Sequence, residues 1–201
     1  DIIVTDGRVP RIKTVEQVLA EVDHCVKRGA HYILFGDANF IGNMPFARKL
    51  LKALVEYSQK NNYPVEFCCE LTINVAHNPD LLELLQAANF YSVFIGIESP
   101  RRDSLIETKK LQNTRQDMLS DIEKIHSHHI SVMAGMIVGF DSDDQLIFKE
   151  QFDFLKELGF PFTTCGTLMA LPNTPLLKRM QAEGRLLDFE WSTMNGHGAA
   201  D

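Results

Sequence analysis

The stretch Phe90-Tyr-Ser-Val-Phe-Ile-Gly-Ile-Glu-Ser-Pro100 decides the fold expected for this chain. An apolar and aromatic run ended by a proline, which cannot donate to a sheet ladder, is typical of a buried strand. In a parallel sheet covered by helices, the carboxyl ends of the strands are where side chains leave the core and meet a ligand. Glu98 and Ser99 are therefore functional candidates, and a simple helix cap after an ordinary strand is the alternative.

Strand and helix patterns alternate on both sides of this stretch. Predicted strands cover residues 31–35, 65–69, 91–97, 130–140 and 162–168. Helical spacing of apolar residues predicts helices over 15–26, 46–57, 81–88, 114–125, 142–155 and 176–182. The repeat of roughly 30 residues fits a strand-helix-strand unit, so an α/β fold with a parallel sheet is expected. An open doubly wound sheet and a partial or complete barrel both satisfy the pattern, although the Gly-x-Gly-x-x-Gly turn of dinucleotide folds is absent.

The fifth predicted helix carries a capping pattern, Ser142 with Gln145, like that of Thr14 with Gln17 in the first helix. Its expected buried stripe consists of Phe148, Phe152 and Leu155.

Composition limits the function classes. With 201 residues and 45% hydrophobic content, the chain is long enough for one sizeable core. The net charge of -7 argues against nucleic acid as a partner, because phosphate backbones attract clustered Lys and Arg. No apolar run is long enough to span a bilayer. Since the chain starts at Asp1 and enters at once into Ile2-Ile3-Val4, we expect a segment of a longer protein.

The four cysteines are scattered, which indicates reduced thiols and a cytoplasmic location rather than a disulfide framework. Cys25 is expected on the buried face of the first helix. Cys68 and Cys69 are adjacent in a strand and point to opposite faces, so they cannot chelate one metal ion together. The run His126-Ser-His128-His129 falls at a helix end away from the candidate site, where a solvated turn is expected.

Polar side chains follow every predicted strand. If the strands are parallel, these groups ring one mouth of the sheet. Helix capping is the alternative for Asp141, which directly precedes a helix. The groups are Asp37 and Asn39, Glu70, Glu98 and Ser99, Asp141, and then Thr167 and Asn173.

Six ordered motifs carry a family resemblance over nearly the whole chain. They are Asp1-Ile-Ile-Val4 with Gly7-Arg-Val-Pro-Arg11, Asp37-Ala-Asn-Phe-Ile-Gly-Asn43, Gly96-Ile-Glu-Ser-Pro100, Lys110-Leu-Gln-Asn-Thr114, Gly135-Met-Ile-Val-Gly-Phe-Asp141 and Leu171-Pro-Asn-Thr-Pro175. The ordered set resembles the catalytic region of radical S-adenosylmethionine (SAM) enzymes. More narrowly, it is similar to the cobalamin-dependent class with an N-terminal cobalamin-binding domain.

The resemblance implies a partial, TIM-like (β/α)6 barrel over residues 1–188, with residues 189–201 starting a C-terminal extension or linker. In this family a Cys-x-x-x-Cys-x-x-Cys loop after the first strand holds a [4Fe-4S] cluster. None of the four cysteines matches that loop, so the first strand and the cluster cysteines are expected before Asp1. The fragment alone is therefore expected to be inactive.

The resemblance also assigns cofactor-binding roles at the mouth. Asp37 falls where the family binds the methionine amino group, although relatives often show two adjacent acidic residues there, and Glu70 falls at a ligand-facing position. Ribose or methionine contacts are implied for Glu98 and Ser99. The implied contacts to adenine come from Gly135 and Ile137 and from Leu171 to Asn173, and Asn39 completes the set of SAM-binding residues.

The complete protein is expected to cleave SAM reductively to a 5'-deoxyadenosyl radical, with cobalamin-dependent methyl transfer to carbon. The implied partners are a reductant such as flavodoxin or ferredoxin and a small-molecule or lipid-like substrate. One alternative is a non-catalytic barrel module that binds a small ligand or a partner. Another is a metal-dependent lyase with Asp37, Glu70 and Glu98 as ligands.

Overall fold

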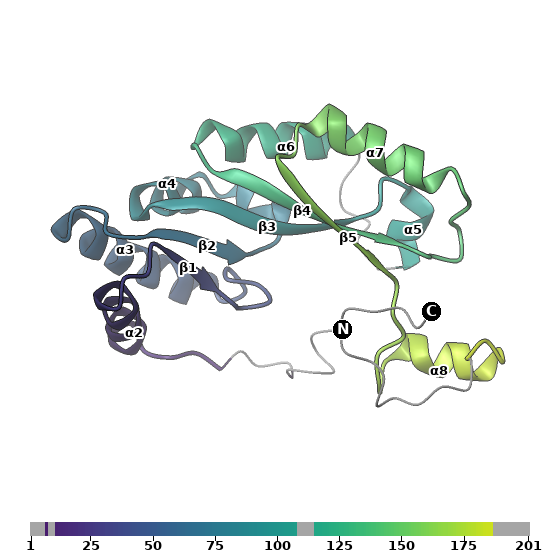
Figure 1. Cartoon of the computed structure of the whole chain (residues 1–201), viewed down its shortest axis with the longest axis horizontal. Helices are drawn as coiled ribbons and strands as arrows, with labels where there is room; N and C mark the ends of the chain where they lie inside the picture. Colours follow the sequence, from purple (N-terminus) through teal and green to yellow (C-terminus); the bar gives the residue numbers. More distant parts are fainter. Residues whose placement is uncertain (1–6, 8–10, 108–114, 187–201) are drawn as a thin grey trace.

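Five parallel strands form one curved sheet in the computed structural model, which describes residue 7 and residues 11–107 and 115–186 (Figure 1). The strands are β1 (Tyr32–Phe35), β2 (Glu66–Glu70), β3 (Phe90–Glu98), β4 (Ser131–Val138) and β5 (Phe162–Thr167). Their order in space is their order along the chain. A doubly wound sheet reverses its strand order at a switch point, so the predicted partial barrel is confirmed and the doubly wound alternative is excluded.

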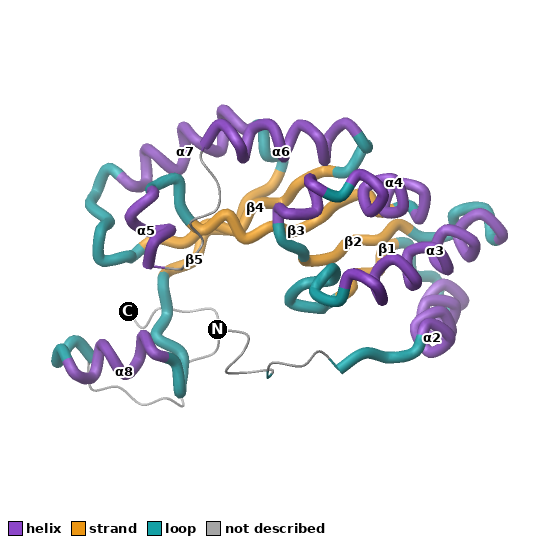
Figure 2. Tube along the Cα trace, turned by 180° about the vertical axis from the view of Figure 1, so that it is seen from behind, coloured by secondary structure: helices purple, strands orange, loops and turns teal. Residues whose placement is uncertain are grey.

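The helices lie mainly on one side of this sheet (Figures 1 and 2). In chain order they are α2 (Val15–Lys27), α3 (Met44–Lys60), the short 3-10 helix η1 (Ile73–His77), α4 (Pro79–Ala88), α5 (Arg102–Glu107), α6 (Arg115–Ser127), α7 (Ile147–Leu158) and α8 (Pro175–Ala182). The last helix, α8, stands apart from the sheet beyond the carboxyl end of β5. None of the helices in the described ranges is long and apolar enough to cross a membrane.

The core lies between the sheet and these helices. Phe67, Val93 and Val132 point toward the helices and are fully buried. Along each strand they alternate with residues that face the other side of the sheet. Against them pack leucines and isoleucines that are almost fully buried, each of which stabilises the fold by about 1.5–3 kcal/mol. They are Leu51 and Leu54 of α3, Leu81, Leu82 and Leu85 of α4, and Ile122 and Ile125 of α6.

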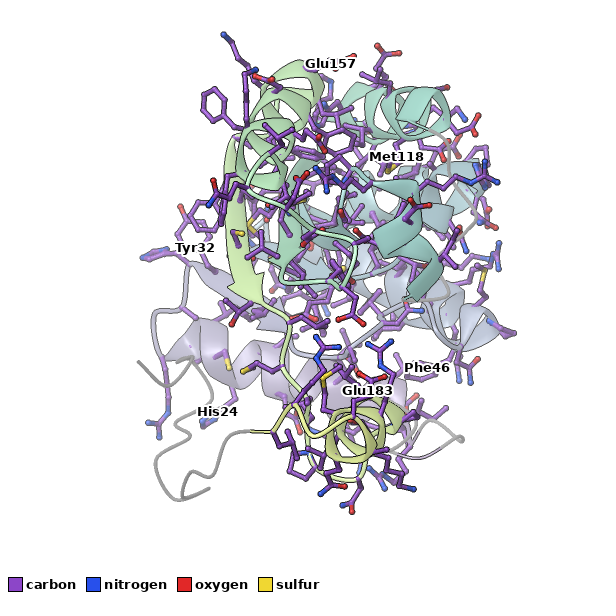
Figure 3. All side chains as sticks on the ribbon, turned by 90° about the vertical axis from the view of Figure 1, so that its right-hand side faces the viewer. His24, Tyr32, Phe46, Met118, Glu157 and Glu183 are labelled. Carbon is purple, nitrogen blue, oxygen red and sulfur yellow. The ribbon has the colours of Figure 1, made fainter. Side chains whose placement is uncertain are left out.

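The other side of the sheet, here called the open face, is not covered by helices. Leu34 and Phe162 lie on it and are 61% and 58% exposed. Figure 3 shows Tyr32 on this side and Phe46 of α3 on the opposite side. Large apolar side chains are thus presented on the concave side of a half-barrel.

The predicted start of α7 is wrong, and so are two of the three residues of its predicted buried stripe, while the third, Leu155, does pack against the core. The helix begins at Ile147 after Leu146, which makes no side-chain cap, so the Ser142–Gln145 capping box does not form. Phe148 and Phe152 are 64% and 66% exposed. The physical reason is that a different stripe faces the sheet. It consists of Ile147, Gln151, Phe154 and Leu158, and Gln151 is accommodated because its Nε2 donates to the carbonyl oxygen of Ile137 at 2.7 Å.

The first helix begins as predicted, with a reciprocal capping box between Thr14 and Gln17. Cys25 is exposed rather than buried, because α2 turns Val15 and Val22 toward the core. The motif Lys110–Thr114, which includes the predicted start of the fourth helix, and the segment 189–201 lie outside the described residues.

Candidate functional site

Acidic side chains gather where neighbouring strands end. Glu70 is the last residue of β2 and Glu98 the last residue of β3, and both are half-buried. Asp37 follows the end of β1 by two residues and is exposed. Because the strands are parallel, these three carboxylates belong to one edge, here called the mouth, which faces the viewer in Figure 3.

Glu98 has an unusual backbone. Its φ of 72° lies in the left-handed region, and the pairing of β3 with β4 shifts register between Gly96 and Glu98. A non-glycine residue there costs about 1–3 kcal/mol and persists only where its surroundings hold it. The bulge interrupts the alternation of side chains at the carboxyl end of β3, where Glu98 is the last residue of the strand.

Ser99 shapes the turn that follows. It is fully buried, and its Oγ accepts a hydrogen bond from the backbone N–H of Arg101 at 3.2 Å. Its own N–H donates to the carbonyl oxygen of Ile97 at 3.0 Å. The hydroxyl oxygen therefore helps to start the turn into α5.

The loop after β1 is fastened to the end of β2. The N–H of Phe40 donates to the carbonyl oxygen of Glu70 at 2.8 Å, and the ring of Phe40 packs on Phe35 at a centroid distance of 5.2 Å. In this loop, Oδ1 of Asn39 is buried and has no hydrogen-bond donor among the described residues. An acceptor without a donor fits a ligand that brings one.

Gly135 and Ile137 occupy open-face positions of β4. Gly135 pairs with Gly96, and a Cβ placed on it would come within 2.7 Å of the ring of Phe94. Phe94 thus fills the space that the glycine leaves. Ile137 is half-buried and pairs with Gly166 of β5. A Cβ placed on Gly166 would meet no atom within 4 Å.

Leu171 and Asn173 lie in the turn between β5 and α8. The carbonyl oxygen of Leu171 accepts hydrogen bonds from Oγ1 and N–H of Thr174, at 2.7 and 3.3 Å. Asn173 is exposed with a φ of 63°, a conformation that asparagine tolerates better than most residues.

Asp141 joins the mouth to α8. Its two carboxylate oxygens accept from Arg185 at 2.7 Å and from Arg179 at 2.9 Å. The hydrogen bond from Arg185 and the charge of Arg179 lower the pKa of Asp141. Asp141 therefore acts as a tether for α8 and not as the cap of α7.

The four cysteines, Cys25, Cys68, Cys69 and Cys165, are free thiols. Burial raises the pKa of Cys69 and that of Cys165, which disfavours their thiolate forms. Within the ranges that the structure covers, no three His, Cys, Asp or Glu side chains form a group that could hold a metal ion. Asp37, Glu70 and Glu98 thus do not form the ligand set that the lyase alternative requires.

Two residues at the mouth, Phe94 and Arg101, carry no sequence signal that marks them as part of the site. Phe94 was one apolar residue in a buried run, and only its pairing with Glu70 and Met133 reveals that it faces the open side. Arg101 connects three segments, and no sequence signal distinguishes it from the neighbouring Arg102.

A parallel half-barrel with acidic groups at its carboxyl edge defines an α/β barrel of the kind that binds ligands at that edge. The family model described as the radical SAM superfamily matches residues 3–150. The chain belongs to this superfamily.

Two curated relatives are similar over most of the chain. The "Hopanoid C-2 methylase" of Rhodopseudomonas palustris (strain TIE-1) is 38% identical over 182 residues, which cover 90% of this chain and 34% of the relative. An "Uncharacterized methyltransferase" of Synechocystis sp. (strain ATCC 27184 / PCC 6803 / Kazusa) is 39% identical over 196 residues, which cover 97% of this chain and 37% of the relative. The chain thus spans about a third of the length of these relatives.

Solved structures share the fold. The radical S-adenosylmethionine methyltransferase TsrM of Kitasatospora setae, with cobalamin and a [4Fe-4S] cluster bound, superimposes with a TM-score of 0.73 at 17% identity. The match covers 88% of this chain and 34% of TsrM. OxsB, a cobalamin-dependent S-adenosylmethionine radical enzyme with aqua-cobalamin bound, superimposes with a TM-score of 0.69 at 18% identity. The match covers 87% of this chain and 32% of the OxsB chain.

Proposed function

We propose that this chain is the SAM-binding barrel of a radical SAM methyltransferase. The observation that carries the proposal is the acidic mouth, where Glu70 and Glu98 end neighbouring strands of the family's barrel. SAM is positive at its sulfonium and at its amino group, so half-buried carboxylates at this edge suit it. The names of the two curated relatives support methyl transfer as the reaction.

The residues at the mouth fit SAM in three respects. The loop from Asp37 to Asn39 offers a carboxylate and an acceptor without a donor, which match the ammonium group. We assign to Glu98 the ribose or methionine portion, with Ser99 shaping the turn behind it. We place adenine against Ile137, with Gly135 and the turn containing Leu171 and Asn173 close by.

The described cysteines do not fit a [4Fe-4S] cluster. Cys68 and Cys69 are buried in β2, while Cys25 and Cys165 lie on α2 and β5. In our proposal the complete protein holds the cluster on other cysteines, where it would supply the electron for SAM cleavage. What these residues do is bind and orient SAM and exclude water from it.

We extend the proposal to the rest of the protein. Residues 1–188 form the partial barrel and residues 189–201 begin an extension, while a separate domain binds cobalamin and a protein such as flavodoxin or ferredoxin delivers electrons. Cobalamin in TsrM and OxsB supports the second domain.

We propose a lipid-like hydrocarbon as substrate. The exposed Leu34 and Phe162 on the open face support an apolar substrate, because burying them against it removes apolar surface from water. The hopanoid named for one relative is a substrate of this kind.

The test is methyl transfer by the complete protein. The protein is reconstituted anaerobically with iron, sulfide and cobalamin, and reductant, hydrocarbon lipids and SAM carrying a 13C-labelled methyl group are added. We expect labelled lipid from the complete protein and none from a variant without its cluster cysteines. No labelled product and no consumption of SAM by cluster-loaded protein would contradict the proposal and favour the non-catalytic module.

A further inference from the structure

Arg101 links the two loops that leave the mouth after β3 and β4. Its side chain is 19% exposed, although arginine is ordinarily a surface residue. Nε and Nη2 donate to the two carboxylate oxygens of Glu150 at 2.6 and 3.0 Å, which is the bidentate geometry that fixes direction as well as distance. Figure 1 shows α5, which begins one residue after Arg101, near the amino-terminal end of α7, which carries Glu150.

The same guanidinium also binds the loop itself. Nη2 donates to Oδ1 of Asp144 at 2.6 Å and Nη1 to the carbonyl oxygen of Ser142 at 3.0 Å. The hydrogen bonds to Glu150 and Asp144 raise the pKa of Arg101, and the same bonds lower the pKa values of Asp144 and Glu150. Lysine could not form all of these hydrogen bonds, because its ammonium group lacks the planar, forked arrangement of N–H donors of a guanidinium.

A second link runs parallel to the first. Oγ of Ser104, which is fully buried, lies 3.0 Å from Oγ of Ser142 and donates to Oδ1 of Asp143 at 3.1 Å. The other carboxylate oxygen of Asp143 accepts from the N–H groups of Gly139 and Phe140, at 2.8 and 3.1 Å. The loop after β4 is therefore folded on itself and attached to α5 as one unit.

This connection also reaches the residue next to Glu98, whose φ is positive. The N–H of Arg101 donates to Oγ of Ser99, so the anchored residue also fixes the residue next to Glu98. Strain of this kind lasts only where neighbouring contacts over-determine the conformation. Arg101, which is held by Ser142 and Asp144 of the adjacent loop and by Glu150 of α7, contributes one such contact.

We propose that Arg101 is a positioning residue for SAM. It does not touch the ligand; it holds the loops after β3 and β4 at the spacing at which Glu98 and the end of β4 enclose SAM between them. This inference rests on the proposed function.

The test uses the complete, cluster-loaded protein and measures SAM affinity by calorimetry and KM and kcat for SAM. We expect Arg101→Met, which keeps the apolar stem, to weaken SAM binding about tenfold, a usual size for coupling between sites. KM should rise while kcat at saturating SAM is retained, because Arg101 does not contact the reacting atoms. Glu150→Gln should give a smaller loss in the same direction, and Arg101→Lys should fall between wild type and Arg101→Met.

The matched control is Lys149→Met. Lys149 is the residue before Glu150, and its ion pair with Asp153 stays within α7. This variant should bind SAM as wild type does. The double variant Arg101→Met/Glu150→Gln should bind no more weakly than Arg101→Met, since both residues act through one contact.

The outcomes separate the two claims. If the wild-type protein does not bind SAM, the proposed function fails and this inference fails with it. If wild type binds SAM and both Arg101→Met and Glu150→Gln bind it equally well, only the positioning role is overturned. If Arg101→Met does not fold, the affinities of Arg101→Lys and Glu150→Gln decide in the same way.

Discussion

Gly135 and Phe94 show how one missing Cβ shapes the mouth. The ring of Phe94 occupies the space above Gly135, so the glycine is needed for packing whatever else it contacts. From the sequence, Gly135 could be placed in a strand and, by resemblance, near adenine. That an aromatic ring covers it depends on the register of β3 against β4, which no local pattern encodes.

We expect Gly135→Ala to destabilise the complete protein by about 1–3 kcal/mol, because the new methyl group would overpack Phe94. Gly166→Ala is the control, since a Cβ there meets nothing within 4 Å. Thermal unfolding measures both. Equal midpoints for the two variants would contradict the contact between Phe94 and Gly135.

Glu98 and Asp141 both follow strands, but their surroundings separate their roles. Asp141 is already paired with Arg179 and Arg185, whereas Glu98 ends its strand in a strained conformation at the mouth. A hydrogen bond to a charged group contributes about 1.5–3 kcal/mol, so Glu98→Ala should weaken SAM binding by about 10- to 100-fold. Asp141→Ala should weaken it less, and calorimetry on the complete protein measures both. Unchanged affinity for Glu98→Ala would overturn its assignment.

The acidic partners of Arg101 predict a pH dependence. The pKa values of Asp144 and Glu150 are lowered in the folded state, so their contribution is present above their ordinary pKa values and lost as pH falls through the folded ones. We expect the difference in thermal midpoint between wild type and Arg101→Met to be largest near pH 7. It should shrink below about pH 4 and in high salt. A difference in thermal midpoint that grows as the pH falls would contradict this role of Asp144 and Glu150.

At the scale of elements, α7 shows where periodicity misleads. Phe148 and Phe152 recur at helical spacing, yet a second stripe that includes Ile147 and Phe154 is the buried one. Both stripes are apolar enough to form a core, and the choice depends on how the preceding loop enters the helix. Asp143 and Asp144 set that entry through hydrogen bonds to backbone N–H groups, which the spacing of apolar residues does not reveal.

The two stripes make opposite predictions for alanine substitution. Phe154 is 1% exposed and Phe152 is 66% exposed. Phe154→Ala should cost about 3–5 kcal/mol of folding free energy, whereas Phe152→Ala should stay within about 0.5 kcal/mol. Denaturant unfolding of the complete protein, monitored by hydrogen exchange of the backbone amides of α7, measures both changes. A larger loss for Phe152→Ala would show that another part of the protein covers that face.

At the scale of the whole molecule, the alternation of strands and helices was sufficient to predict a parallel sheet. The ordered motifs then selected the partial barrel over the doubly wound sheet. Glu70 and Glu98 could be placed at the mouth because strand ends are visible in the sequence. The network around Arg101 could not, since it joins residues more than 40 positions apart and requires the loops to be folded.

The measurement that tests the central claim most directly is hydrogen exchange of the complete, cluster-loaded protein with and without SAM. Bound SAM should slow exchange of backbone amides in the strand ends and loops of the mouth, at residues 36–40, 70–72, 97–101 and 135–141. Amides at the opposite end of the strands, around Tyr63 and Glu66, should exchange as before. Protection confined to that opposite end, or no change at the mouth at saturating SAM, would contradict the account.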